Sequence, residues 1–164
     1  PSQFIFKLSN RLRVQEPTAE YIVDLLPGFE GLSETEQRAL RTSRIGQGVF
    51  RDGLLRLWGG CAVTGYRRPA MLLASHIKPW RLSTNIERLD PYNGLLLQPT
   101  IDRLFDRGLV SFDRVGKLIR SRSITVDELI LLGVNPKAEL RRVPDSTEAY
   151  LRYHRDNELG KTDA

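Results

Sequence analysis

His76 is one of only two histidines in the chain, and it lies near the end of an apolar, strand-like run from Leu72 to Ile77. An imidazole near its neutral pKa is a good general base when another group orients its second nitrogen. Hydrolysis of a phosphodiester needs such a base to deprotonate water, and a cation to neutralise the charge that builds on the phosphate. Composition alone favours a structural histidine, so the neighbouring residues must decide.

Two carboxylates follow on a segment with helical spacing, residues 100–105. Asp106 stands one helical turn after Asp102, so both carboxylates share one face of the helix and could approach a single cation. Carboxylate oxygens are hard ligands suited to Mg²⁺ or Mn²⁺. Asp106 could equally cap the helix or pair with Arg103 or Arg107, and both interpretations stay open.

Three blocks of sequence come in a fixed order at tight spacing. They are Ser75–Trp80, Asp90–Leu97 and Asp102–Leu109. Together they resemble consecutive blocks of the HNH, or ββα-metal, endonucleases. Residues 61–65, Cys-Ala-Val-Thr-Gly, are similar to the opening strand of a restriction-type subset of that family. The likeness covers roughly residues 46–112.

The resemblance implies a role for each motif position. His76 would be the general base, and Asn93 would pin the loop between the strands and help to orient the base. Asp102 occupies the third motif position, commonly a histidine that binds the metal, and Asp106 would assist it. Ser75 stands where the family often has Asp or His. An Asn before Gly also has an ordinary turn-forming explanation.

The implied activity is that of a metal-dependent DNA endonuclease that hydrolyses phosphodiester bonds. Mg²⁺ is the expected ion, with Mn²⁺ as the alternative, and double-stranded DNA is the expected partner. RNA or single strands remain an alternative substrate. By analogy the chain would be the cleavage domain of a restriction or defence protein. The rival hypothesis is a non-catalytic DNA-binding module whose HNH site is degenerate, because Ser75 is a poor ligand and the third histidine is missing.

The charge of the chain suits a polyanionic partner. Lys and Arg number 25 against 20 Asp and Glu, which gives a net charge of +5. This modest excess fits nucleic acid, although many basic proteins bind none. The cations nearest the motif are the expected phosphate contacts: Arg44, Arg51, Lys78 and Arg81. Each of them, taken singly, also fits an ordinary solvated surface charge.

The pattern of apolar and turn residues predicts an α+β domain. It has a helical N-terminal part, a central ββα-metal (HNH) motif, an added β-hairpin and C-terminal helices. Helices are expected at 17–26, from 33 towards 44 and, after Gly46 and Gly48, at 49–58. Strands are expected at 61–64 and 71–77, a loop at 82–90, buried apolar residues at 95–97 and a helix at 100–105. A hairpin (109–112 with 117–120) and helices at 126–132 and 146–157 follow.

Three further side chains have competing interpretations. Asp90 could hydrogen-bond to the residues that bind the metal. Trp80 could pack in the core or stack on a nucleobase, and His154 is expected to pack on a C-terminal helix.

The domain organisation is read from the same patterns. Residues 1–32 are expected to be a linker or the tail of a preceding domain, 33–160 the nuclease domain and 161–164 a frayed tail. The chain begins with Pro1 and holds one methionine, so we expect a further domain upstream. Without a membrane span or signal peptide, and with the single Cys61, the sequence favours a cytoplasmic protein and no membrane partner. Double-strand cutting with one site per chain leaves room for a homodimer.

Overall fold

The computed structural model describes residues 34–161, and we describe side chains from Gly46 onward. Contacts divide the chain into the units Pro1–Ile45 and Gly46–Ala164, and everything below concerns the second unit. The expected helix at 17–26, the preceding tail and the side chain of Arg44 lie outside the described residues.

The helix that leads into the site is continuous. α3 spans Glu34–Trp58, so the expected break at Gly46 and Gly48 is wrong. Each glycine costs a helix about 1 kcal/mol relative to alanine, and burial of Phe50, Leu54 and Trp58 along one face offsets that cost. A Cβ on Gly46 would lie 3.3 Å from a Leu89 methyl, so this glycine lets the helix approach that residue closely.

A two-stranded hairpin forms the centre of the unit. β1 (Leu73–His76) pairs antiparallel with β2 (Gly94–Leu97), and His76 lies opposite Gly94. The expected strand at 61–64 is wrong, because this segment forms a turn in which Ala62 N donates to Leu96 O at 2.7 Å. The partner of β1 is instead the run at 94–97, which the sequence marked only as apolar filling. All four of its residues are buried.

The connection between β1 and β2 carries a helix that was expected to be a loop. It consists of η2 (Trp80–Leu82), α4 (Asn85–Leu89) and η3 (Pro91–Asn93). Thr84 and Glu87 form a reciprocal capping box at the start of α4, which satisfies two backbone donors of a helix only five residues long. This short helix fixes the shape of the connection beside His76.

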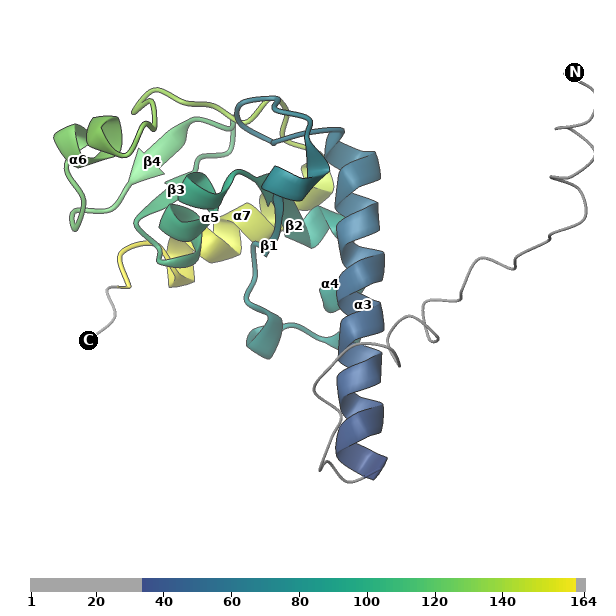
Figure 1. Ribbon diagram of the computed structural model, residues 1–164. Coiled ribbons are helices and arrows are strands. Elements are labelled where there is room, and N and C mark those ends of the chain that lie inside the picture. The colour runs from purple at the N-terminus through teal and green to yellow at the C-terminus, as the bar shows by residue number, and fades with distance from the viewer. Residues whose placement is uncertain (1–33, 162–164) are drawn as a thin grey trace, which may run out of the picture. The chain divides into compact units, whose positions relative to one another are not determined.

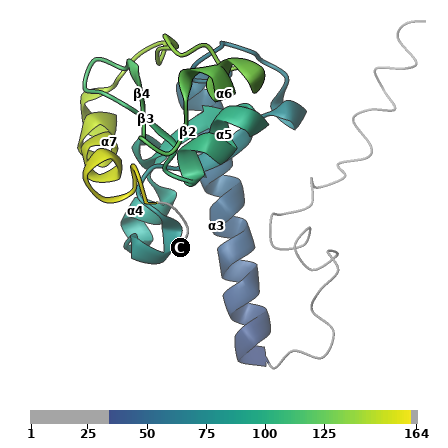
Figure 2. The ribbon, with the colours of Figure 1, turned by 90° about the vertical axis from the view of Figure 1, so that its left-hand side faces the viewer.

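The remaining elements follow the predicted order. α5 (Pro99–Asp106) completes the ββα unit, and β3 (Val110–Phe112) pairs with β4 (Leu118–Arg120) as the expected hairpin. α6 (Val126–Leu131) and α7 (Asp145–Asn157) confirm the two C-terminal helices. Figures 1 and 2 show α5 beside the β1–β2 hairpin, and α7 contacts β3 and η3. The α+β architecture is therefore confirmed.

One apolar core connects these elements. It is built from α3, both strands of the central hairpin, α5, β3 and α7, with Phe50, Leu95, Phe105, Phe112 and Leu151 among its fully buried members. The indole nitrogen of Trp58 donates to Gly94 O at 3.1 Å, which ties α3 to β2. No helix among residues 34–161 has the length and apolar character to cross a bilayer.

Candidate active site

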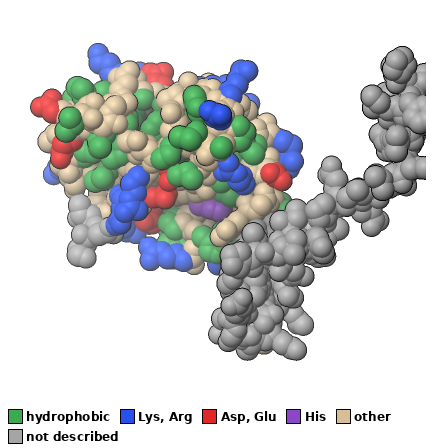
Figure 3. Space-filling model, in the orientation of Figure 1, with side chains coloured by type: hydrophobic (Ala, Val, Ile, Leu, Met, Phe, Trp, Pro, Cys, Tyr) green, Lys and Arg blue, Asp and Glu red, His purple; other side chains and the backbone are tan. Residues whose placement is uncertain are grey.

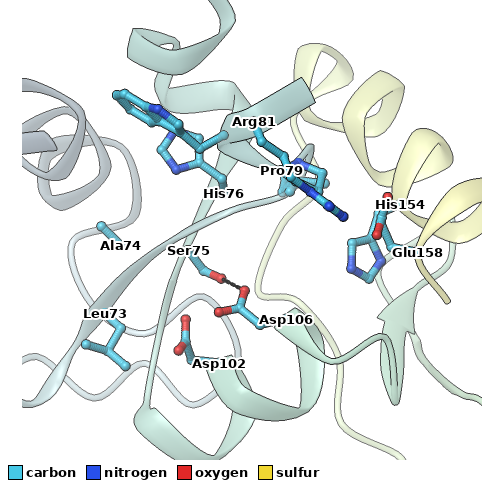
Figure 4. Close-up of a pocket in the computed structure, with 12 residues that line it drawn as sticks. Leu73, Ala74, Ser75, His76, Pro79, Arg81, Asp102, Asp106, His154 and Glu158 are labelled. Carbon is cyan, nitrogen blue, oxygen red and sulfur yellow. Dashed lines mark hydrogen bonds between the residues drawn. The ribbon is translucent and has the colours of Figure 1, made fainter. Parts of the chain in front are cut away.

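A cavity of about 520 Å³ opens where β1 meets α5. Ser75 and His76 of β1, Arg81 of η2, and Asp102 and Asp106 of α5 line it together. Figure 4 shows both carboxylates rising from one helix towards the strand that carries Ser75 and His76, and Figure 3 shows a histidine in a hollow beside acidic and basic side chains. Four side chains of the sequence hypothesis therefore share one cavity: His76, Arg81, Asp102 and Asp106.

The imidazole of His76 is fixed on three sides. Its ring stacks on Phe50 with centroids 3.7 Å apart, and it meets the edge of Trp80 at 5.4 Å. Nε2 lies 3.0 Å from the carbonyl oxygen of Arg88. A carbonyl only accepts, so this contact places the hydrogen on Nε2 and leaves Nδ1 with its lone pair in the neutral ring. Burial lowers the pKa of His76, which favours that neutral form.

The surroundings of the two carboxylates of α5 disfavour their charged forms. Desolvation raises the pKa of Asp102, and the neighbouring Asp106 raises it further. Desolvation also raises the pKa of Asp106. The Ser75 hydroxyl donates to Asp106 Oδ1 at 3.1 Å and opposes this shift in part. Two carboxylates that are costly to ionise together become stable as anions when a cation lies between them.

The chemistry of this donor set fits a hard divalent ion. Asp102 and Asp106 offer carboxylate oxygens, and Ser75 adds a hydroxyl oxygen, which are the ligand types that Mg²⁺ accepts while it keeps several waters. Within residues 34–161, no group of three or more His, Cys, Asp and Glu side chains is arranged to hold a metal. An ion here would therefore depend on two protein carboxylates, with water and phosphate oxygens as its other ligands.

Asn93 lies behind the cavity and holds its loop in shape. The side chain is fully buried in η3 and lines neither cavity beside His76. Its Oδ1 accepts from Lys78 N at 2.8 Å, and its Nδ2 donates to Glu87 O at 3.0 Å. These bonds tie the end of β1 to α4, whose last turn supplies the carbonyl that holds His76.

A comparison with known families decides what this arrangement is. Residues 61–113, about a third of the chain, match the model described as HNH endonuclease. This segment is similar to the HNH endonuclease family. The match begins at Cys61 and ends just after β3, so it spans the ββα unit that carries the cavity. No curated protein matches the chain. HNH nucleases generally use divalent metals, and the match supports a nuclease-type segment at the level of the family.

The expected phosphate contacts of the HNH domain lie in different surroundings. Arg81 is exposed at the cavity. Lys78 instead pairs with Glu87 at 2.7 Å and lies over the ring of Tyr153. Arg51 donates to the carbonyl oxygens of Leu72 and Pro69 at 2.8 and 2.7 Å.

Three further side chains near the HNH motif have structural contacts. Asp90 accepts from Tyr92 N and from the Tyr150 hydroxyl, both at 2.9 Å. Trp80 packs against His76 and lies beneath the guanidinium of Arg88. His154 is buried, as expected, and stacks on Phe105 with centroids 3.8 Å apart. Its ring lines the cavity, although Ser111 and Phe105 engage its two nitrogens.

Sequence reasoning missed two contributors to the HNH site. Phe50 was read only as part of the apolar face of a helix, yet its ring contacts the imidazole of His76 directly. Ser75 was read as a weak ligand, whereas its hydroxyl holds Asp106. Position 75 gave a usable signal, because Ser75 directly precedes His76 and a serine hydroxyl can donate to a carboxylate. No local signal identifies Phe50.

Proposed function

We propose that this chain is a metal-dependent DNA endonuclease in which His76 is the general base and Asp102 and Asp106 hold the metal. The observation that carries the proposal is the convergence of a neutral, oriented imidazole and two adjacent carboxylates on one cavity. General base, metal ligands and an open space between them are what phosphodiester hydrolysis requires.

In this proposal Nδ1 of His76 takes a proton from the attacking water. The hydrogen bond from Nε2 to Arg88 O keeps the lone pair on Nδ1 and stabilises the imidazolium once the proton arrives. Phe50 and Trp80 restrict rotation of the ring, so the lone pair keeps its direction. A bound divalent cation would neutralise charge on the phosphate and on the departing 3′ oxygen.

Other residues hold the substrate and the loop. Arg81, exposed at the cavity, would contact a phosphate oxygen of the bound strand. Asn93 would act as a positioning residue, since it joins the end of β1 to the helix that supplies the Arg88 carbonyl. Lys78 is less available to a phosphate because Glu87 already neutralises it.

One observation favours the rival function, a DNA-binding module without activity. The described residues offer two carboxylates and no third acidic, His or Cys ligand grouped with them. A module of this kind would bind duplex DNA in a salt-sensitive manner and leave it intact.

A panel of substrates tests both functions. Supercoiled plasmid, linear duplex, single-stranded DNA and RNA are incubated with the chain under Mg²⁺, Mn²⁺ or EDTA, and binding is followed in parallel by gel shift. Metal-dependent cleavage of the duplex supports the nuclease. Binding without cleavage in either metal supports the DNA-binding module. Cleavage of RNA or single strands alone would show that duplex DNA is not the substrate.

We place the nuclease in a restriction or defence system, on the likeness of residues 61–65 to that subset. Cells that express the chain should then lose transformation efficiency with foreign plasmid, and His76→Ala should restore it. Equal efficiency with both versions would remove the defence role and leave the nuclease intact. Sedimentation on duplex DNA tests whether two copies assemble for double-strand cutting.

A further inference from the structure

His76 borders a second cavity, of about 310 Å³, on the α3 side of β1. Three of its lining residues, Ala74, His76 and Trp80, also line the first cavity. The other three, Gln47, Phe50 and Arg51, come from α3 and precede the segment that matches the family. The base therefore lies between two neighbouring spaces, and only one of them contains the carboxylate pair.

The two cavities differ in the sign of their charge. Within the described part of the chain, the first is lined by three carboxylates (Asp102, Asp106 and Glu158) against the single guanidinium of Arg81, a balance that suits a cation. Among the described residues that line the second, the guanidinium of Arg51 is the only group with a permanent charge. An anion is therefore the occupant that the second cavity favours.

Arg51 is held in place in a manner that leaves its charge available. Its hydrogen bonds to Leu72 O at 2.8 Å and to Pro69 O at 2.7 Å both go to neutral carbonyls and leave three of its five N–H donors. No carboxylate in the described part of the chain forms an ion pair with it. A guanidinium whose rotamer is already fixed loses little entropy when it binds a phosphate.

We propose that this second cavity is a subsite for a backbone phosphate that neighbours the scissile one, with Arg51 as its anchor and Gln47 at its entrance. The proposal rests on the nuclease function proposed above. Each DNA strand carries a phosphate about every 3.4 Å along the helix axis, so a strand with one phosphate at His76 must place the next phosphates nearby on the protein surface. The shared wall of Ala74, His76 and Trp80 makes the second cavity the adjoining position.

Salt-dependent binding in EDTA tests the subsite without any need for cleavage. A plot of log K against log salt concentration has a negative slope, and each phosphate contact with duplex DNA makes that slope more negative by about 0.9. We therefore expect Arg51→Gln to reduce the magnitude of the slope for a short duplex by about 0.9. Arg56→Gln, an exposed arginine on the same helix that lines neither cavity, should change it less.

Arg51→Gln could also weaken DNA binding indirectly, because Arg51 holds the residues before β1 through its two hydrogen bonds. A second variant that should strengthen binding avoids this ambiguity. Gln47 is exposed, and Gln47→Lys adds a cation to the cavity without touching those tethers. It should tighten binding and steepen the slope, whereas Val49→Lys, exposed on α3 outside the cavity, should do so less. Equal effects at 47 and 49, or an unchanged slope in Arg51→Gln, would overturn the subsite. If the wild type binds DNA but does not cleave it, the proposed nuclease function fails, whereas the phosphate-binding role of Arg51 is still judged by the slopes.

Discussion

The ring of Phe50 lies against the imidazole of His76, with centroids 3.7 Å apart and planes within 11° of each other. The same ring fills the space where a Cβ on Gly94 would stand, only 2.4 Å from Phe50 Cζ. Gly94 faces His76 across the hairpin. A helix that precedes the family-matched segment thus packs directly against the imidazole of His76.

Phe50→Leu should weaken catalysis by loosening the His76 ring while it keeps an apolar side chain in the core. A stacked ring pair is worth about 0.5–1.5 kcal/mol, which corresponds to a loss in kcat of roughly 2- to 10-fold. Nitrogen NMR of His76 should show a less uniform tautomer, a change that loss of stability alone would not cause. Leu54→Ala, on the same helix, is the control. Matching losses of activity in both variants, corrected for the folded fraction, would contradict a positioning role.

Asp106→Asn should abolish cleavage and yet stabilise the metal-free protein at neutral pH. Because the folded protein raises the pKa of Asp106, ionisation of that carboxyl costs stability above its folded pKa. The amide removes this cost and can still accept from Ser75. Thermal unfolding in EDTA should therefore give a higher Tm than wild type.

The same variant should lose stabilisation by metal. Mg²⁺ at a hundred times its Kd would stabilise the wild type by about 2.7 kcal/mol. Asp106→Asn should respond much less, and Asp127→Asn, exposed on α6, should respond as wild type does. An equal Mg²⁺ response in all three proteins would show that α5 does not hold the ion.

Cleavage should persist to mildly acidic pH. Burial lowers the pKa of His76 below its usual 6.5, so the neutral, proton-accepting form dominates at pH 7. With saturating Mg²⁺, kcat should fall only as the pH drops below about 6.5, a value set by the ordinary pKa of histidine. An acidic limb centred above pH 7 would contradict this environment for the base.

His154 should make the fold sensitive to acid. Burial lowers its pKa to about 4, whereas the unfolded chain keeps a value near 6.5. Neutral, buried His154 therefore contributes to the free energy of unfolding above pH 6.5. This contribution is lost as the pH falls towards 4, and its maximum is about 3 kcal/mol. His154→Gln should flatten the dependence of unfolding free energy on pH in that window. A slope identical to that of the wild type would show that another group causes the acid sensitivity.

Local patterns predicted the elements that carry the chemistry. The helical spacing from Thr100 placed Asp102 and Asp106 on one face of α5, and the turn at Asp113–Gly116 correctly marked the β3–β4 hairpin. These features depend on residues only a few positions apart, so composition and period are enough to find them.

Tertiary contacts account for what the sequence did not predict. α3 continues through Gly46 and Gly48 because its core face compensates for two poor helix formers. Residues 61–64 form a turn because β1 pairs instead with β2, which begins 18 residues after β1 ends. The contact between Phe50 and His76 likewise joins distant positions. The Thr84–Glu87 capping box of α4 is the exception, since its signal was local and readable.

The central claim is that His76 and the carboxylates of α5 form one catalytic centre. The most direct measurement is cleavage of supercoiled and linear duplex DNA under Mg²⁺, Mn²⁺ and EDTA by wild type, His76→Ala, Asp102→Ala and the exposed control Asp127→Asn. We predict cutting by wild type and control that EDTA abolishes, and none by the other two variants, which should still bind DNA. Undiminished cutting by His76→Ala or Asp102→Ala, or intact DNA with bound wild type in every metal, would contradict the account.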